Sequence, residues 1–222
     1  SHVAGLLGAV LFLAHPVQTE SVSYMAGLPE PMGGLFLLLG LIVYLKSVES
    51  KSWAIYGGAI GLFVLALFSK ESMVVFAPLA VLLVMFLWPK YKKKEKKYAK
   101  YSLGGLLGLA AVYSLLKIKV LHFGGGELQI IENSFYTEHL YVRIFTFIHV
   151  LWDYAVLVLF PVNLYFVKPY ECVISLISLQ GIVSLLGLIL VLGAAWFSFK
   201  KDRKIFLAVG WFFLAMIPHM GL

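Results

Sequence analysis

The segment 89–100, Pro-Lys-Tyr-Lys-Lys-Lys-Glu-Lys-Lys-Tyr-Ala-Lys, separates two long apolar runs, 73–88 and 101–121. Seven of its twelve residues are lysine and only one is acidic. Lysine clusters that adjoin apolar runs stay on the cytoplasmic side of a membrane. The segment therefore predicts a chain that crosses a bilayer, and it indicates which loops face the opposite side.

Apolar runs recur along the whole chain of 222 residues, and 61% of the residues are hydrophobic. Soluble domains are only about 45–50% apolar, so a water-soluble fold of this size could not bury this much apolar surface. The runs are continuously apolar and lack the alternation of a membrane β-barrel. We predict an all-α, polytopic integral membrane helix bundle with about six or seven spans. The runs are 3–14, 32–45, 53–68, 73–88, 101–121, 144–160, 173–199 and 205–217.

The formal net charge of +7 comes mainly from two basic clusters, 89–100 and 200–204. Nucleic-acid-binding proteins carry such charge on a soluble face, whereas these clusters adjoin apolar runs. We therefore expect contact with membrane lipid and no nucleic-acid partner. With both clusters in the cytoplasm, five basic and eight acidic residues lie outside. Acidic residues contribute little to orientation, so their accumulation outside needs a separate explanation.

The run 144–160 conflicts with a simple alternation of spans. If it and run 173–199 both crossed, the second basic cluster would lie outside. The run is 17 residues long, contains His149 and Asp153, and follows Arg143. Ionisable side chains are costly in lipid. We predict that 140–160 is a re-entrant or interfacial helix on the outer side and that 173–199 crosses.

Two outer stretches near the start carry candidate site residues. In 15–22, Pro16 ends the first apolar run, and His15 and Glu20 flank a polar connection that could also serve only to join helices. In 27–31, two prolines fix Glu30 at the mouth of the next run, where it could bind a cation, orient a hydroxyl, or simply be solvated.

A third outer stretch, Ser69-Lys70-Glu71-Ser72, joins two short apolar runs. A lysine held near the interface suits a lipid phosphate or pyrophosphate. The alternative is a lysine that extends toward the headgroups beside a neighbouring carboxylate.

The outer stretch 122–143 contains three consecutive glycines, but no Gly-Lys-Ser/Thr follows, so it is not a P-loop. Its histidines and acids lack metal-ligand spacing. We predict no metal site, although a loosely held divalent cation is compatible with the residues. The single cysteine, Cys172, excludes an intrachain disulfide.

Several motifs together resemble a family of multi-pass glycosyltransferases of the GT-C type. They are similar to the transmembrane and tetratricopeptide-repeat O-mannosyltransferases and their prokaryotic homologues. The matching segments are His15-Pro16-Val17-Gln18-Thr19-Glu20-Ser21-Val22, Ser69-Lys70-Glu71, Arg143 with the later Phe160-Pro161-Val162-Asn163-Leu164, and the closing Trp211 to Pro218. They cover nearly the whole chain in the same order.

The resemblance implies a GT-C-like fold and transfer of a sugar, such as mannose, from a polyprenyl-phosphate donor. The acceptor would be a protein or glycan on the non-cytoplasmic side. By the same resemblance, Lys70 and Arg143 face the donor phosphate. His15, Glu20, Glu30 and Glu71 form the acceptor or cation site. A prokaryotic source would place the protein in the cell membrane, and a eukaryotic source in the endoplasmic reticulum membrane.

Two departures limit the resemblance. The family has Gly-Arg-x-Asp where this chain has Gly27-Leu28-Pro29-Glu30. Its catalytic aspartate lies in a first outer loop that would precede Ser1. We therefore expect residues 1–222 to be one transmembrane domain from a longer protein. It would lack an N-terminal span with that loop and a C-terminal repeat domain, and it would be inactive alone.

Two other functions stay open. A transporter or flippase of lipid-linked substrate would carry internal repeats and broken segments near the midplane, and the sequence contains no repeat. A non-catalytic membrane scaffold does not explain the outer acidic residues. The sequence leaves open the sugar, the acceptor, the catalytic base, any metal need and the oligomeric state.

Overall fold

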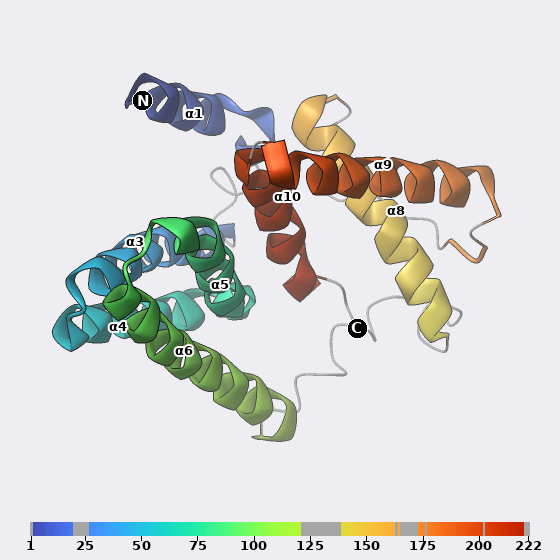
Figure 1. The fold of residues 1–222 in the computed structure, drawn as a ribbon. Coiled ribbons are helices and arrows are strands. Elements are labelled where there is room, and N and C mark those ends of the chain that lie inside the picture. The colour runs from blue at the N-terminus through green and yellow to red at the C-terminus, as the bar shows by residue number, and fades with distance from the viewer. Residues whose placement is uncertain are drawn as a thin grey trace.

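A computed structural model describes residues 2–19, 27–120, 139–162, 164, 173–175, 177–201 and 203–219. Within these ranges the regular structure is helical and contains no strand, so the predicted all-α class is confirmed (Figure 1). The α-helices are α1 (His2–Ala14), α3 (Pro29–Ser50), α4 (Trp53–Ser69), α5 (Phe76–Leu87), α6 (Lys93–Val120), α8 (Leu140–Leu159), α9 (Leu179–Lys201) and α10 (Arg203–Met216). Short 3-10 turns are η1 (Pro16–Gln18), η3 (Glu71–Val75), η4 (Trp88–Lys90) and η6 (Ile217–His219).

Five helical stretches in the described residues are long and apolar enough to cross a membrane. Large apolar side chains such as Leu39, Ile42 and Leu190 are exposed along them, and lipid is the solvent that covers such surfaces. The chain is therefore a polytopic membrane helix bundle. The stretches are Pro29–Ser50, Glu71–Lys90, Lys93–Lys119, Leu140–Leu159 and Leu179–Phe197, and Gly5–Ala14 and Trp53–Ser69 are shorter apolar helices.

Helices α3 and α4 form an antiparallel hairpin with a tight turn. Lys51 adopts the left-handed conformation (φ 55°, ψ 35°), and its backbone N–H donates to the Ser47 carbonyl. Ser52 then caps α4, because its hydroxyl accepts from the Ile55 N–H at 3.4 Å. A non-glycine residue in this conformation costs roughly 1–2 kcal/mol, which the surrounding hairpin packing has to offset.

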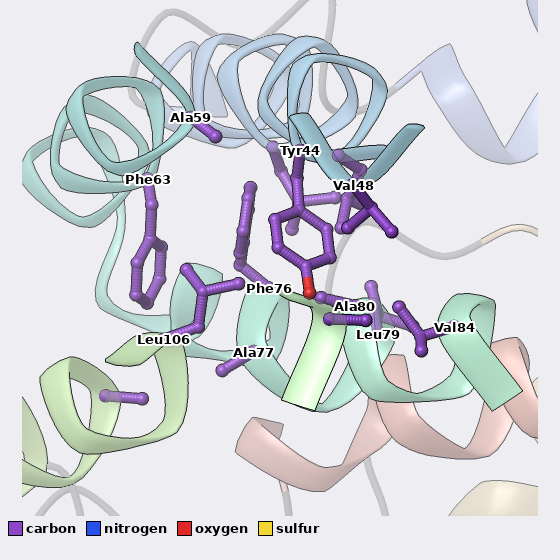
Figure 2. Packing of buried hydrophobic residues seen from close by; sticks show 14 of the residues in the cluster. Tyr44, Val48, Ala59, Phe63, Phe76, Ala77, Leu79, Ala80, Val84 and Leu106 are labelled. Atoms are coloured by element: carbon purple, nitrogen blue, oxygen red, sulfur yellow. The ribbon is translucent and has the colours of Figure 1, made fainter. Parts of the chain in front are cut away.

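The main core lies where α3, α4, α5 and α6 meet. Figure 2 shows Tyr44, Phe63 and Phe76 reaching this core from three different helices, and all three are fully buried. The Phe63 and Phe76 rings stack with centroids 4.7 Å apart. Phe76 also fits over Gly40, where an added Cβ would lie only 2.5 Å from the Phe76 Cε2 atom. The close approach of α3 and α5 therefore depends on a glycine.

Aromatic hydroxyls fasten the lysine-rich start of α6 to the α3–α4 hairpin. The Tyr44 hydroxyl lies 3.2 Å from Ser102 Oγ, and the Tyr56 hydroxyl donates to the Ser102 carbonyl at 2.9 Å. The Tyr98 hydroxyl donates to the Ser52 carbonyl at 2.8 Å. Buried hydroxyls that are satisfied in this way fix the relative position of the helices.

Helix α10 packs on both α5 and α9 and so links the two groups of helices (Figure 1). A Cβ on Gly210 would lie 3.2 Å from Leu82 Cδ1, and η6 packs on η3. Helices α5 and α10 therefore run antiparallel, which puts Arg203, at the start of α10, at the same end of this pair as η4. Both basic clusters thus lie at one end of the bundle, as the predicted topology requires. Which side of a membrane that end faces stays a prediction.

The length of α8 contradicts one premise of the prediction for 140–160, namely that this segment is too short to cross. All but the last of the 17 residues of the apolar run lie in a continuous helix of 20 residues, which is long enough to cross a membrane. The helix is longer than the run because Leu140 to Arg143 form its first turn. Insufficient length is therefore no reason to exclude a span.

The contacts of α8 show its direction relative to α9. His149 contacts Ser184, and Trp152 lies against Gly187, so α8 and α9 run in the same direction where they touch. Residues 160–178 separate the two helices. The Val173 N–H donates to Thr146 Oγ1 at 3.0 Å, which shows that the chain has returned to the first half of α8. The re-entrant or interfacial position itself stays a prediction.

His149 and Asp153 of α8 lie on the side that packs against α9. The Ser184 hydroxyl donates to the Gln180 carbonyl at 2.7 Å, and His149 Nδ1 lies 2.8 Å from Ser184 Oγ. The other ring nitrogen, Nε2, is 3.8 Å from Asp153 Oδ2. These side chains face protein rather than lipid, which lowers the cost of placing them in an apolar helix.

Candidate functional site

Two ion pairs lie at the end of the bundle opposite the basic clusters. Lys70 Nζ pairs with Glu30 Oε1, and Lys117 Nζ lies 2.6 Å from Glu71 Oε2. We call these four residues the rim cluster. Three of them, Glu30, Lys70 and Glu71, are candidate site residues from two separate stretches of the sequence, and the structure joins these stretches through the pair of Glu30 with Lys70.

The local backbone explains why Lys70 and Glu71 have different partners. Lys70 ends α4 in an extended conformation (φ −154°, ψ 134°), and its N–H still donates to the Ala66 carbonyl. Successive side chains along extended backbone point in opposite directions. Lys70 consequently reaches α3, whereas Glu71, at the start of η3, reaches α6.

The other two members come from helix ends. Glu30 lies in the first turn of α3, between Pro29 and Pro31, where the positive end of the helix dipole favours a carboxylate. Lys117 lies in the last turn of α6, where the negative end of the dipole favours an ammonium group. Both charges are therefore compatible with their helices.

The rim cluster is electrically balanced and partly exposed. Its exposed side-chain fractions are 47% for Glu30, 29% for Lys70, 43% for Glu71 and 26% for Lys117. Partly exposed ion pairs contribute only about 0–1 kcal/mol, so a ligand can exchange with one partner at low cost. The ammonium groups suit phosphate, and the carboxylates suit a hydroxyl or a cation. Next to Glu71, the buried Ser72 hydroxyl has no hydrogen-bond partner in the described part of the chain.

The remaining predicted residues lie elsewhere or outside the described residues. His15 Nδ1 accepts from the Val17 N–H at 3.3 Å, and Nε2 lies 3.1 Å from the Val158 carbonyl oxygen. Because a carbonyl only accepts, Nε2 carries the proton, and these bonds tie η1 to the end of α8. Arg143 lies in the first turn of α8, which packs mainly on α9. Glu20 lies outside the described residues, and its role, like that of Arg143, stays a prediction.

Sequence reasoning did not include Lys117 in the site. The available signal was a lysine in the last turn of an apolar run, at the end that the charge pattern places outside. That signal does not identify Glu71 as its partner, because the two are joined only by tertiary packing. Among the described residues, no group of three or more His, Cys, Asp or Glu side chains could hold a metal ion.

An apolar pocket of about 420 Å³ lies between α5, α9 and α10. Its lining is almost entirely apolar and includes Leu82, Trp196, Phe206 and Phe213. It is separate from the rim cluster and offers no polar group to orient a headgroup.

Comparison with known proteins gives one informative similarity. Over 50 residues, 22% of this chain, the sequence is 36% identical to protein O-mannosyl-transferase tmtc2 of Xenopus laevis. That stretch is 6% of the Xenopus protein, so this chain spans only a small part of its length. No protein-family model matches the chain, and no solved structure matches it. The similarity is thus to part of a protein named as a mannosyl-transferase, in a chain that the structure shows to be a polytopic membrane helix bundle.

Proposed function

We propose that this chain is part of a membrane-embedded glycosyltransferase. It transfers a sugar, such as mannose, from a polyprenyl-phosphate-linked donor to a protein or glycan acceptor on the non-cytoplasmic side. The observation that carries the proposal is the rim cluster, which holds a lysine and two candidate carboxylates at the end of the bundle opposite both basic clusters. The partial similarity to an O-mannosyl-transferase supports the same class of reaction.

Lys70 binds the donor phosphate in this function. A polyprenyl-phosphate sugar is a phosphodiester with one negative charge, and its leaving group gains a second charge as the glycosidic bond breaks. An ammonium group therefore interacts more strongly with the transition state than with the bound donor, which is what accelerates a reaction. Arg143 is the second predicted phosphate ligand.

The carboxylates serve the acceptor in this function. Glu30 and Glu71 orient the acceptor hydroxyl or hold a cation, together with His15 and Glu20. Removal of the acceptor proton needs a general base, and that residue is not assigned within this chain.

The test is sugar transfer by the intact protein in proteoliposomes, with a polyprenyl-phosphate mannose that carries a radiolabel in the sugar. Replacing Lys70→Ala should lower kcat by about 100-fold, the cost of losing one electrostatic stabiliser of a transition state. Lys119→Ala is the matched control, because it removes an exposed lysine from the same end of the bundle without touching either ion pair.

Three results would contradict the proposal. They are the absence of sugar transfer by the intact protein, an unchanged kcat for Lys70→Ala, and an equal loss in Lys119→Ala. Movement of the labelled lipid across the membrane without transfer of its sugar would favour a transporter or flippase. If the protein neither transfers the sugar nor moves the lipid, the result would favour a non-catalytic scaffold.

A further inference from the structure

Lys70, the residue assigned to the donor phosphate, is already paired with an anion. We propose that the donor phosphate takes the place of Glu30 on Lys70, so that donor binding releases the Glu30 carboxylate for the acceptor. This inference rests on the proposed function, since it specifies how the same site binds its two substrates. It makes Glu30 a residue that couples the two binding events.

The charges of the rim cluster favour exchange over simple addition. With Glu30 and Glu71 opposite Lys70 and Lys117, the cluster carries no net charge. A phosphodiester added to Lys70 would bring a second anion close to the Glu30 carboxylate. If Glu30 moves away, the phosphate occupies the position of one carboxylate and the local balance is kept.

The second ion pair keeps Lys70 in place during the exchange. Lys70 and Glu71 are consecutive, and Glu71 is held from α6 by Lys117 at 2.6 Å. The Lys70 backbone is fixed on both sides, because its N–H donates to Ala66 and its carbonyl accepts from the Met73 N–H at 3.1 Å. Loss of the Glu30 contact therefore leaves the backbone of Lys70 in place, and the flexible side chain can turn its ammonium group toward the phosphate.

Glu30 is the carboxylate suited to leave. Its side chain is 47% exposed, the most exposed of the cluster, and its position in the first turn of α3 favours the ionised form without a lysine partner. Once released, it can accept a hydrogen bond from an acceptor hydroxyl or bind a cation. The arrangement thus predicts ordered binding, with the donor first.

The experiment measures the affinity of the intact protein in nanodiscs for a short-chain polyprenyl-phosphate mannose. Glu30→Gln should bind this donor about two- to fivefold more tightly than the wild type, because it removes a weak competitor for Lys70. The same variant should transfer sugar more slowly, so the donor KM and kcat fall together. Lys70→Ala should bind the donor more weakly.

The double variant separates exchange from a general electrostatic effect. In the Lys70→Ala background, Glu30→Gln should leave donor affinity unchanged, because the competition passes through Lys70. An uncharged polyprenol should bind all variants equally, and matched melting temperatures should confirm that each variant is folded.

The possible failures are distinguishable. If the wild type binds and uses the donor but Glu30→Gln does not tighten binding, the exchange is wrong and the proposed function stands. A gain that persists without Lys70 also overturns the exchange. If no variant binds the donor or transfers sugar, the proposed function fails as well.

Discussion

The contact between α3 and α5 gives a quantitative test of the fold that holds the rim cluster. In Gly40→Ala, the new methyl carbon would lie 2.5 Å from Phe76 Cε2, 3.1 Å from Phe76 Cζ and 3.3 Å from Leu62 Cβ. Carbon atoms prefer separations of about 3.5–4.0 Å, so the ring would have to move by roughly 1 Å. The Phe76 ring is fully buried and stacked on Phe63, which leaves it no free direction.

The expected loss can be worked out against a matched control in the same helix. Overpacking of this kind costs about 1–3 kcal/mol, whereas replacing glycine by alanine in a helix gains about 1 kcal/mol. Gly34→Ala makes the same helical gain with no atom within 4 Å of the new methyl group. The gain cancels between the two variants, so Gly40→Ala should be less stable than Gly34→Ala by about 1–3 kcal/mol.

The assay is reversible unfolding of the protein in detergent micelles, followed by tryptophan fluorescence. A second change, Phe76→Leu, shortens the side chain that meets the new methyl group and should recover part of the loss in Gly40→Ala. Equal stability of Gly40→Ala and Gly34→Ala would refute the packing described for α3 and α5. So would a loss in Gly40→Ala that Phe76→Leu does not reduce.

Two further predictions concern the lysine-rich end of the bundle and its position relative to the end that carries the rim cluster. Burial above all, together with the nearby carboxylates Glu49 and Glu95, raises the pKa of Tyr91 to about 12. The folded protein therefore holds this proton more tightly than the unfolded chain, and stability falls as the pH rises from about 10 to about 12. The Tyr91 hydroxyl is buried without a hydrogen-bond partner among the described residues. Tyr91→Phe should therefore keep or raise the stability at pH 7 and should lose less stability than the wild type by pH 12. Identical pH profiles of the variant and the wild type in melting experiments would contradict this. In a cysteine-free background, Lys70→Cys and Lys97→Cys should react with a membrane-impermeant thiol reagent from opposite sides of the membrane, and labelling of both from one side would contradict the predicted topology.

The helical class followed from the sequence because it depends on composition and on charge next to apolar runs. Lysines 90–100 predict a cytoplasmic segment, and in the structure they extend from the end of η4 into the first turns of α6; the side of the membrane stays a prediction. The boundaries of the apolar runs did not predict helix boundaries, because a helix continues through polar residues when its backbone hydrogen bonds remain satisfied. Helix α8 begins before Arg143 for this reason.

The site could be predicted only in part. Glu30, Lys70 and Glu71 stood out because each is a charged residue in a short outer turn, and the structure groups them. Lys117 did not stand out, because its role depends on the packing of the end of α6 against η3. His15 stood out for its motif, yet its described bonds are to backbone groups of η1 and α8.

The two attachments of α6 affect how the bundle responds to its membrane. This helix has 28 residues, and the part that follows the lysine-rich segment, 101–120, corresponds to about 30 Å, close to the roughly 30 Å of the hydrocarbon layer. Helices usually adjust to a thicker or thinner bilayer by tilting. Tyrosine hydroxyls join α6 to the α3–α4 hairpin at one end, and the Glu71–Lys117 pair adds a weaker contact with η3 at the other. We therefore expect α6 to tilt together with α3 and α4 when the bilayer thickness changes, which would keep the spacing of the four rim charges.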